Sequence, residues 1–125
     1  PPANLAIVSK IIDIIREEPE RRKRLLDIAE FMRKSFIEMG YKILHTETPI
    51  IPIFIGDEEL MFKVWRELFE LGVYANPVTP PAVPRNACLI RTSYMATHKD
   101  EQLERVLEAF RKVDKKFGIT ESKEY

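Results

Sequence analysis

Two short apolar segments, residues 48–55 and 88–95, constrain the fold of this chain more than any other feature. Both are too short for a typical helix, and each contains isoleucine, threonine and an aromatic residue, so we expect strands. The first contains Pro49 and Pro52. A proline cannot donate to a sheet ladder, so this strand is expected at a sheet edge or in an irregular position. Residues 73–78 predict a further short strand, and residues 41–44 are another candidate.

Helical periodicity fills most of the remaining chain, with apolar residues three and four positions apart. The predicted helices are residues 3–17, a second from Pro19 towards Gly40, a third after Asp57 and a last one before Gly118. The inward-facing residues should be Leu25, Ile28, Ala29, Met32, Phe36 and Met39 in the second helix, Leu60, Met61, Val64, Trp65 and Leu68 in the third, and Leu103, Val106, Leu107, Phe110, Val113 and Phe117 in the last.

Helix-end signals support these assignments. Asp57 is a good N-cap for the third helix, and glycines at positions 40, 72 and 118 suit helix ends. Thr97 and Asp100 predict a capping box for the last helix, with His98 in its first turn. The order α-α-β-α-β-β-α predicts an α+β fold, in which a small, largely antiparallel sheet carries helices packed on one face.

Length and charge limit the classes of function. The chain has 125 residues, with 20 basic and 20 acidic side chains, so we expect one domain and no general attraction for nucleic acid or anionic membranes. No apolar run approaches the ~20 residues of a membrane span. Cys88 is the only cysteine, which excludes an intrachain disulfide and favours a reducing cytoplasm. A helical pattern starts at once without an initiator methionine. This suggests a piece of a larger protein, although a processed natural terminus would look the same.

Both faces of the predicted sheet carry apolar residues. Alternate residues of a strand share a face, so Cys88, Ile90, Thr92 and Tyr94 lie opposite Leu89, Arg91, Ser93 and Met95. An antiparallel sheet with helices on one side normally has a polar outer face. We therefore expect the second face to be covered, either by the chain's own loops or by something outside it.

Arg91 is the strongest candidate for a binding residue. Its neighbours on that face, Leu89 and Met95, are apolar, so its charge needs a carboxylate or phosphate partner. The guanidinium fork suits a planar carboxylate. The alternatives are a structural ion pair with a glutamate and an arginine that reaches solvent from an edge strand.

The remaining candidates are weaker. Pro80, Pro81 and Pro84 stiffen the segment before Arg91, which suits either a gate over a ligand or an ordinary turn. His98 and His45 are expected to be polar surface residues, and Cys88 a buried, inert thiol. The sequence shows no metal-ligand spacing, phosphate-binding glycine loop or nucleophile motif.

Four segments of the sequence resemble one known family: "TPIIPIFIGDE", "GVYANPVTPPAVP", "LIRTSYMATHKDEQLERVLEAF" and "KFGI". They occur in the order seen at the carboxyl end of the α-oxoamine synthases. These are pyridoxal-phosphate enzymes of the aspartate-aminotransferase fold (fold type I), which join an amino acid to the acyl group of an acyl-CoA. The resemblance runs over nearly the whole chain, from residue 1 to residue 119.

The resemblance implies roles for particular residues. Arg91 matches the arginine that holds the α-carboxylate of the amino-acid substrate. Thr79, Pro80, Pro81, Ala82 and Val83 match a mobile segment that closes near the substrate. In the family's serine palmitoyltransferases an arginine stands where this chain has Thr79, and this difference argues against that member. The cofactor lysine and the residues around the cofactor ring have no match here. The chain alone should therefore bind no pyridoxal 5'-phosphate and be inactive.

The resemblance also implies the organisation of a full-length enzyme. Residues 1–125 would form a single C-terminal small domain, with residues 1–17 as the connecting helix from a missing large domain. The enzyme would be a cytoplasmic homodimer of the 2-amino-3-ketobutyrate CoA ligase or 8-amino-7-oxononanoate synthase type. Its partners would be an amino acid, an acyl-CoA and the large domain, with no nucleic acid or membrane. The alternative is a stand-alone α+β module for amino-acid binding or dimerisation.

Overall fold

The computed structural model describes residues 1–121 and contains the predicted order of elements. They are α1 (Pro2–Glu17), α2 (Pro19–Glu38), β1 (Ile50–Gly56), α3 (Glu58–Glu70), β2 (Asn76–Val78), β3 (Cys88–Ser93) and α4 (Asp100–Phe117). The predicted α+β class is confirmed. The strands are shorter than predicted, since β3 ends at Ser93 and β2 begins only at Asn76.

The three strands form one antiparallel sheet in the order β1-β3-β2. β1 is an edge strand and its register with β3 shifts between Phe54 and Gly56, which agrees with the edge or irregular position predicted from Pro49 and Pro52. Residues 41–44 do not form a strand. They make an isolated bridge between Ile43 and Ile53, and Leu44 N–H donates to the carbonyl of Pro52 at 3.2 Å. Pro52, the one proline within β1, has no N–H to donate to a longer ladder on this side.

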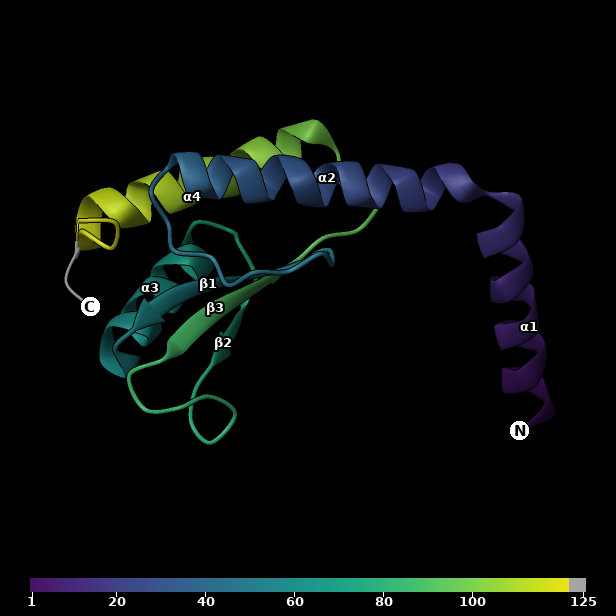
Figure 1. The fold of residues 1–125 in the computed structure, drawn as a ribbon, viewed down its shortest axis with the longest axis horizontal. Helices are drawn as coiled ribbons and strands as arrows, with labels where there is room; N and C mark the ends of the chain where they lie inside the picture. Colours follow the sequence, from purple (N-terminus) through teal and green to yellow (C-terminus); the bar gives the residue numbers. More distant parts are fainter. Residues whose placement is uncertain (122–125) are drawn as a thin grey trace.

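The helices gather on one side of the sheet. Figure 1 shows α2 and α4 side by side above the strands, and these two helices contact each other. α3 contacts all three strands. α1 bends away from α2 at Pro19, contacts no other element of the described chain, and contains no buried residue. The packed part of the domain, on which any functional site would be built, therefore consists of α2, α3, α4 and the sheet.

The hydrophobic core lies between the sheet and these helices. Its strand residues, Ile51, Ile53, Ile90 and Cys88, are fully buried. The helices contribute the residues that periodicity predicted, although six of these are only partly buried and pack against the edge of the core: Leu25, Met39, Leu60, Trp65, Val106 and Phe117.

Three aromatic rings fix the centre of the core. Phe36 lies edge-to-face against Phe110, with ring centroids 4.8 Å apart, and Tyr41 packs edge-on against both. The Tyr41 hydroxyl donates to the carbonyl of Phe110 at 2.8 Å. Burial raises the pKa of Tyr41, so this hydroxyl keeps its proton.

The start of α4 differs from the prediction. The helix begins at Asp100, its N-cap is Lys99, and Gln102 Oε1 accepts from the Lys99 N–H at 2.9 Å. Thr97 is therefore not the cap, and His98 precedes the helix. The reason is a turn from Met95 to His98, closed by a backbone hydrogen bond of 3.1 Å, which uses the residues that the predicted capping box needed.

Replacing Asp57 by alanine should lower the free energy of unfolding by about 1 kcal/mol. Asp57 caps α3, because its Oδ1 accepts from the Leu60 N–H at 2.7 Å. Chemical denaturation measures the change. Asp57→Asn is the matched control, because an asparagine side chain keeps the acceptor and should stay within a few tenths of a kcal/mol. Equal losses in the two variants would show that the charge, not the cap, is what matters.

Candidate functional site

The second face of the sheet is open to solvent over much of its area. It carries Ile50, Pro52 and Phe54 from β1, Asn76 and Val78 from β2, and Leu89, Arg91 and Ser93 from β3. We call this set of residues the open face. Leu89 is buried and Phe54 is partly buried, but Ile50, Arg91 and Ser93 are exposed. The loops of the described chain therefore cover only the Leu89 end of this face.

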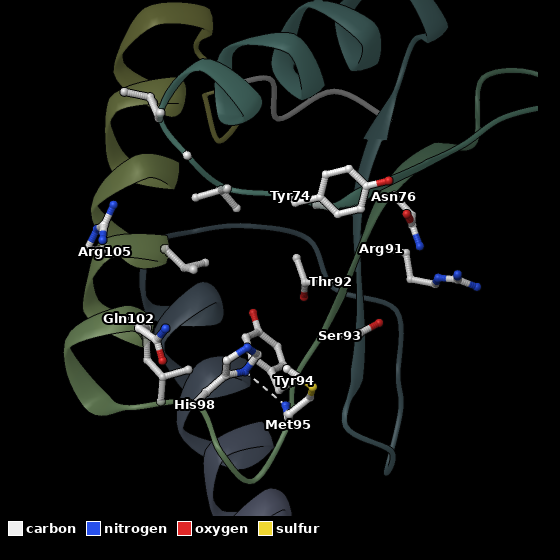
Figure 2. Close-up of a pocket in the computed structure, with 16 residues that line it drawn as sticks. Tyr74, Asn76, Arg91, Thr92, Ser93, Tyr94, Met95, His98, Gln102 and Arg105 are labelled. Carbon is white, nitrogen blue, oxygen red and sulfur yellow. Dashed lines mark hydrogen bonds between the residues drawn. The ribbon is translucent and has the colours of Figure 1, made fainter.

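Arg91 stands near the middle of the open face. It pairs across the sheet with Pro52 on one side and Asn76 on the other. The side chain is exposed and extends away from the sheet, as Figure 2 shows. The expectation of a desolvated guanidinium among apolar neighbours was therefore wrong for this chain. Met95 and Ser93 are exposed as well, so neither shields the Arg91 guanidinium from solvent.

No carboxylate pairs with Arg91 among residues 1–121, where the eight salt bridges all use other residues. No hydrogen bond of its guanidinium occurs within this part of the chain either. The structural ion pair considered above is therefore absent from the described residues. The fork is free to take a planar anion from outside.

The proline segment forms the loop of the β2–β3 hairpin. Two turns shape it, closed by Ala82 N–H to Thr79 O at 3.0 Å and Ala87 N–H to Pro84 O at 3.1 Å. The Pro80–Pro81 peptide bond is cis. Thr79, Pro80 and Val83 are partly buried, whereas Pro81 and Ala82 are exposed.

The hairpin places this loop next to Arg91. Val78, the last residue of β2, pairs with Leu89, two residues before Arg91 in the same strand. Two residues of a strand span about 7 Å. Thr79–Val83, the residues that the resemblance assigned to a mobile segment, therefore lie in the loop of the same hairpin as Arg91.

A pocket of about 460 Å³ adjoins the open face and was not foreseen from the sequence. It lies between residues 71–76, residues 91–95 and one side of α4 (Figure 2). Arg91 and Arg105 are among its lining residues, and no acidic residue is. Residues 71–75 line it as an irregular segment because β2 begins only at Asn76, a boundary that periodicity does not specify.

Tyr94 and His98 line this pocket. The Tyr94 hydroxyl is buried and has no hydrogen-bond partner in the described residues, and burial raises its pKa. His98 Nδ1 accepts from the Met95 N–H at 3.1 Å, and this hydrogen bond orients the ring. His98 is thus a partly buried wall residue, not the surface residue that we expected, whereas His45 is exposed as expected.

The other candidates do not join a site. Cys88 is buried, as predicted, and burial raises the pKa of its thiol, which disfavours the reactive thiolate. Within residues 1–121 there is no group of three or more histidine, cysteine, aspartate or glutamate residues that could hold a metal ion. None of the helices described there has the length and apolar character to cross a membrane.

Comparison with known proteins gives one family. The model of "Aminotransferase class I and II" matches residues 1–110. A serine palmitoyltransferase from Bacteriovorax stolpii is 45% identical over 119 residues, which cover 95% of this chain and 28% of that protein. An 8-amino-7-oxononanoate synthase/2-amino-3-ketobutyrate coenzyme A ligase from Thermus thermophilus is 37% identical, over 95% of this chain and 30% of that protein.

Solved structures agree with the sequence comparisons. A serine palmitoyltransferase from S. paucimobilis with a bound PLP–myriocin aldimine superposes with a TM-score of 0.80 and 28% identity, over 86% of this chain and 28% of that one. The chain thus spans between a quarter and a third of the length of each of these three proteins. Because the family model covers 110 of the 125 residues, this chain belongs to the aminotransferase class I and II family, in which its relatives are α-oxoamine synthases.

Proposed function

We propose that this chain is the C-terminal small domain of a pyridoxal-phosphate-dependent acyl-CoA:amino acid C-acyltransferase, in which Arg91 holds the α-carboxylate of the amino acid. The observation that carries the proposal is the guanidinium of Arg91 at the middle of the open face, which has no partner within residues 1–121. The relatives support the reaction class, because their names are those of α-oxoamine synthases.

An unpaired arginine on a sheet is well suited to this role. Its planar fork can make two parallel hydrogen bonds to a carboxylate, which fix both the position and the plane of that group. Strand β3 has partners on both sides, so the backbone that holds Arg91 is firmly placed. Arg91 would thus orient the substrate rather than transfer protons or electrons.

The loop of Thr79, Pro80, Pro81, Ala82 and Val83 would close over the bound substrate. Its two turns and its prolines limit the number of loop conformations, so little entropy is lost when it closes. Thr79 does not settle which amino acid is used, since a serine palmitoyltransferase is 45% identical to this chain. Serine therefore remains a candidate substrate beside glycine and alanine.

We also propose that this chain does not make a pyridoxal-phosphate site on its own. Such a site needs a lysine for the Schiff base and an acidic or basic partner for the pyridine nitrogen. The open face contains neither lysine nor acidic residue, and the nearby Lys42 lies over the Phe54 ring at 4.8 Å. In our proposal the cofactor belongs to the remainder of a full-length protein, and this chain alone is inactive.

The first helix fits a connection to that remainder. Six large apolar residues of α1 are exposed, among them Leu5, Val8, Ile11 and Ile15. An exposed apolar stripe of this length is unusual for a free-standing domain. We therefore favour a connecting helix from a large domain over a stand-alone binding module. A cytoplasmic homodimer is part of the same proposal.

Assay of the full-length gene product tests the function. Glycine, alanine and serine are each supplied with short and long acyl-CoAs, and release of free CoA is measured. We expect release with one amino acid and one class of acyl chain, and none from residues 1–125 alone. CoA release by the isolated chain, or none from the full-length protein with any pair, would contradict the proposal.

A further inference from the structure

We infer that Asn76 is a second carboxylate-binding residue, whose side-chain amide donates to the same carboxylate that Arg91 holds. This inference rests on the proposed role of Arg91 and adds the residue that completes the carboxylate site. Neither the relatives nor the family resemblance assigns a role to Asn76.

The register of the sheet places Asn76 beside Arg91. The two residues are directly opposite each other in the β2–β3 ladder, so their side chains lie on the same face. Figure 2 shows both side chains at the same edge of the pocket. Directly opposite residues have Cβ atoms about 5 Å apart. A group held by the Arg91 fork is therefore within reach of the Asn76 amide.

Asn76 is the only direct cross-strand neighbour of Arg91 that can donate from its side chain. The neighbour on the other side is Pro52, which has no polar side-chain atom. Ser93, the next polar residue on this face, pairs with Ile50 instead of standing opposite Arg91. The polar character of the open face is thus concentrated on one side of the guanidinium.

No structural role accounts for Asn76. Asparagine is depleted in strands and is usually kept where its side chain bonds a nearby backbone group in a turn or cap. Asn76 is the first residue of β2, is exposed, and its side chain makes no hydrogen bond with any other residue in the range 1–121. Its amide is therefore available to a ligand.

The chemistry of a carboxylate favours this arrangement. A carboxylate accepts up to about four hydrogen bonds, and a bidentate arginine supplies only two. An amide N–H can supply a third without adding charge. An aspartate at the same position would instead pair with Arg91 and compete with the substrate.

The test uses the full-length enzyme and compares Asn76→Ala, Asn76→Asp and Ser93→Ala. Asn76→Ala should raise the KM for the amino acid about 10-fold, the loss expected for one hydrogen bond to a charged group. Asn76→Asp should raise it about 100-fold, because the new carboxylate occupies the Arg91 fork. Ser93→Ala, which lies on the same face but not opposite Arg91, should change it less than 2-fold. The KM for the acyl-CoA should stay within 2-fold in all three.

The outcomes separate this inference from the proposed function. If Arg91→Ala impairs amino-acid use while both Asn76 variants leave the KM unchanged, the role of Asn76 is wrong and the role of Arg91 stands. If neither Arg91→Ala nor the Asn76 variants change the KM for the amino acid, the proposed roles of Arg91 and Asn76 are both wrong. A change in the acyl-CoA KM alone would also overturn the inference, because it would place Asn76 at a different substrate.

Discussion

Replacing Phe36 with alanine is expected to lower the free energy of unfolding by about 3–5 kcal/mol. Phe36 is fully buried, and its ring packs edge-to-face against Phe110 and Tyr41. The substitution removes the apolar contacts of the ring and leaves a cavity between α2 and α4, whose long helices cannot close in to fill it. A domain of this size has only about 5–15 kcal/mol of stability, so the loss is a large part of the total.

Chemical denaturation measures this loss, with the fluorescence of Trp65, the single tryptophan of the chain, as the signal. Phe62→Ala is the matched control. Phe62 is 44% exposed on the outer side of α3 and has no ring contact with Trp65, so its removal should lower stability by less than about 1 kcal/mol. Similar losses in the two variants would mean that the aromatic cluster is not the centre of the core.

The helical part of the fold could be predicted because it depends on local patterns. A stripe of apolar residues identifies a helix and its inner face together, and Met32, Phe110 and Val113 are all buried as this rule requires. Caps are less certain, since several polar residues can compete for one helix start. The turn at Met95 resolved that competition in favour of Lys99, which is not a common cap residue.

The arrangement around Arg91 could be predicted only in part. The alternation of residues in β3 correctly put Arg91 on the face opposite Ile90. The expected burial of the Arg91 guanidinium was wrong, because burial depends on which other segments cover the sheet face. The residue pattern of one strand contains no information on those segments. The pairing of Arg91 with Asn76 could not be foreseen either, because a loop of nine residues, 79–87, does not fix the register of its hairpin.

Arg91→Ala in the full-length enzyme is expected to reduce kcat/KM for the amino acid about 30-fold to several thousand-fold. Removing one partner of a charge pair that is buried once the substrate is bound costs roughly 2–5 kcal/mol, which corresponds to that range. Arg91→Lys should recover only part of the loss, because an ammonium group cannot make two parallel hydrogen bonds to one carboxylate. Amino-acid titrations and the cofactor spectrum are measured on the same preparations.

The structure also predicts what Arg91→Ala leaves unchanged. Arg91 is exposed and forms no salt bridge within residues 1–121, so its removal breaks no internal ion pair and should shift the melting temperature little. Cofactor binding should be nearly intact, because the cofactor-binding residues are proposed to lie elsewhere. A structural arginine would give the reverse pattern, with a lower melting temperature, loss of cofactor and normal use of the amino acid. That result would mean that Arg91 pairs with a carboxylate of the remaining protein, and the open face would then be an interface between domains instead of a substrate site.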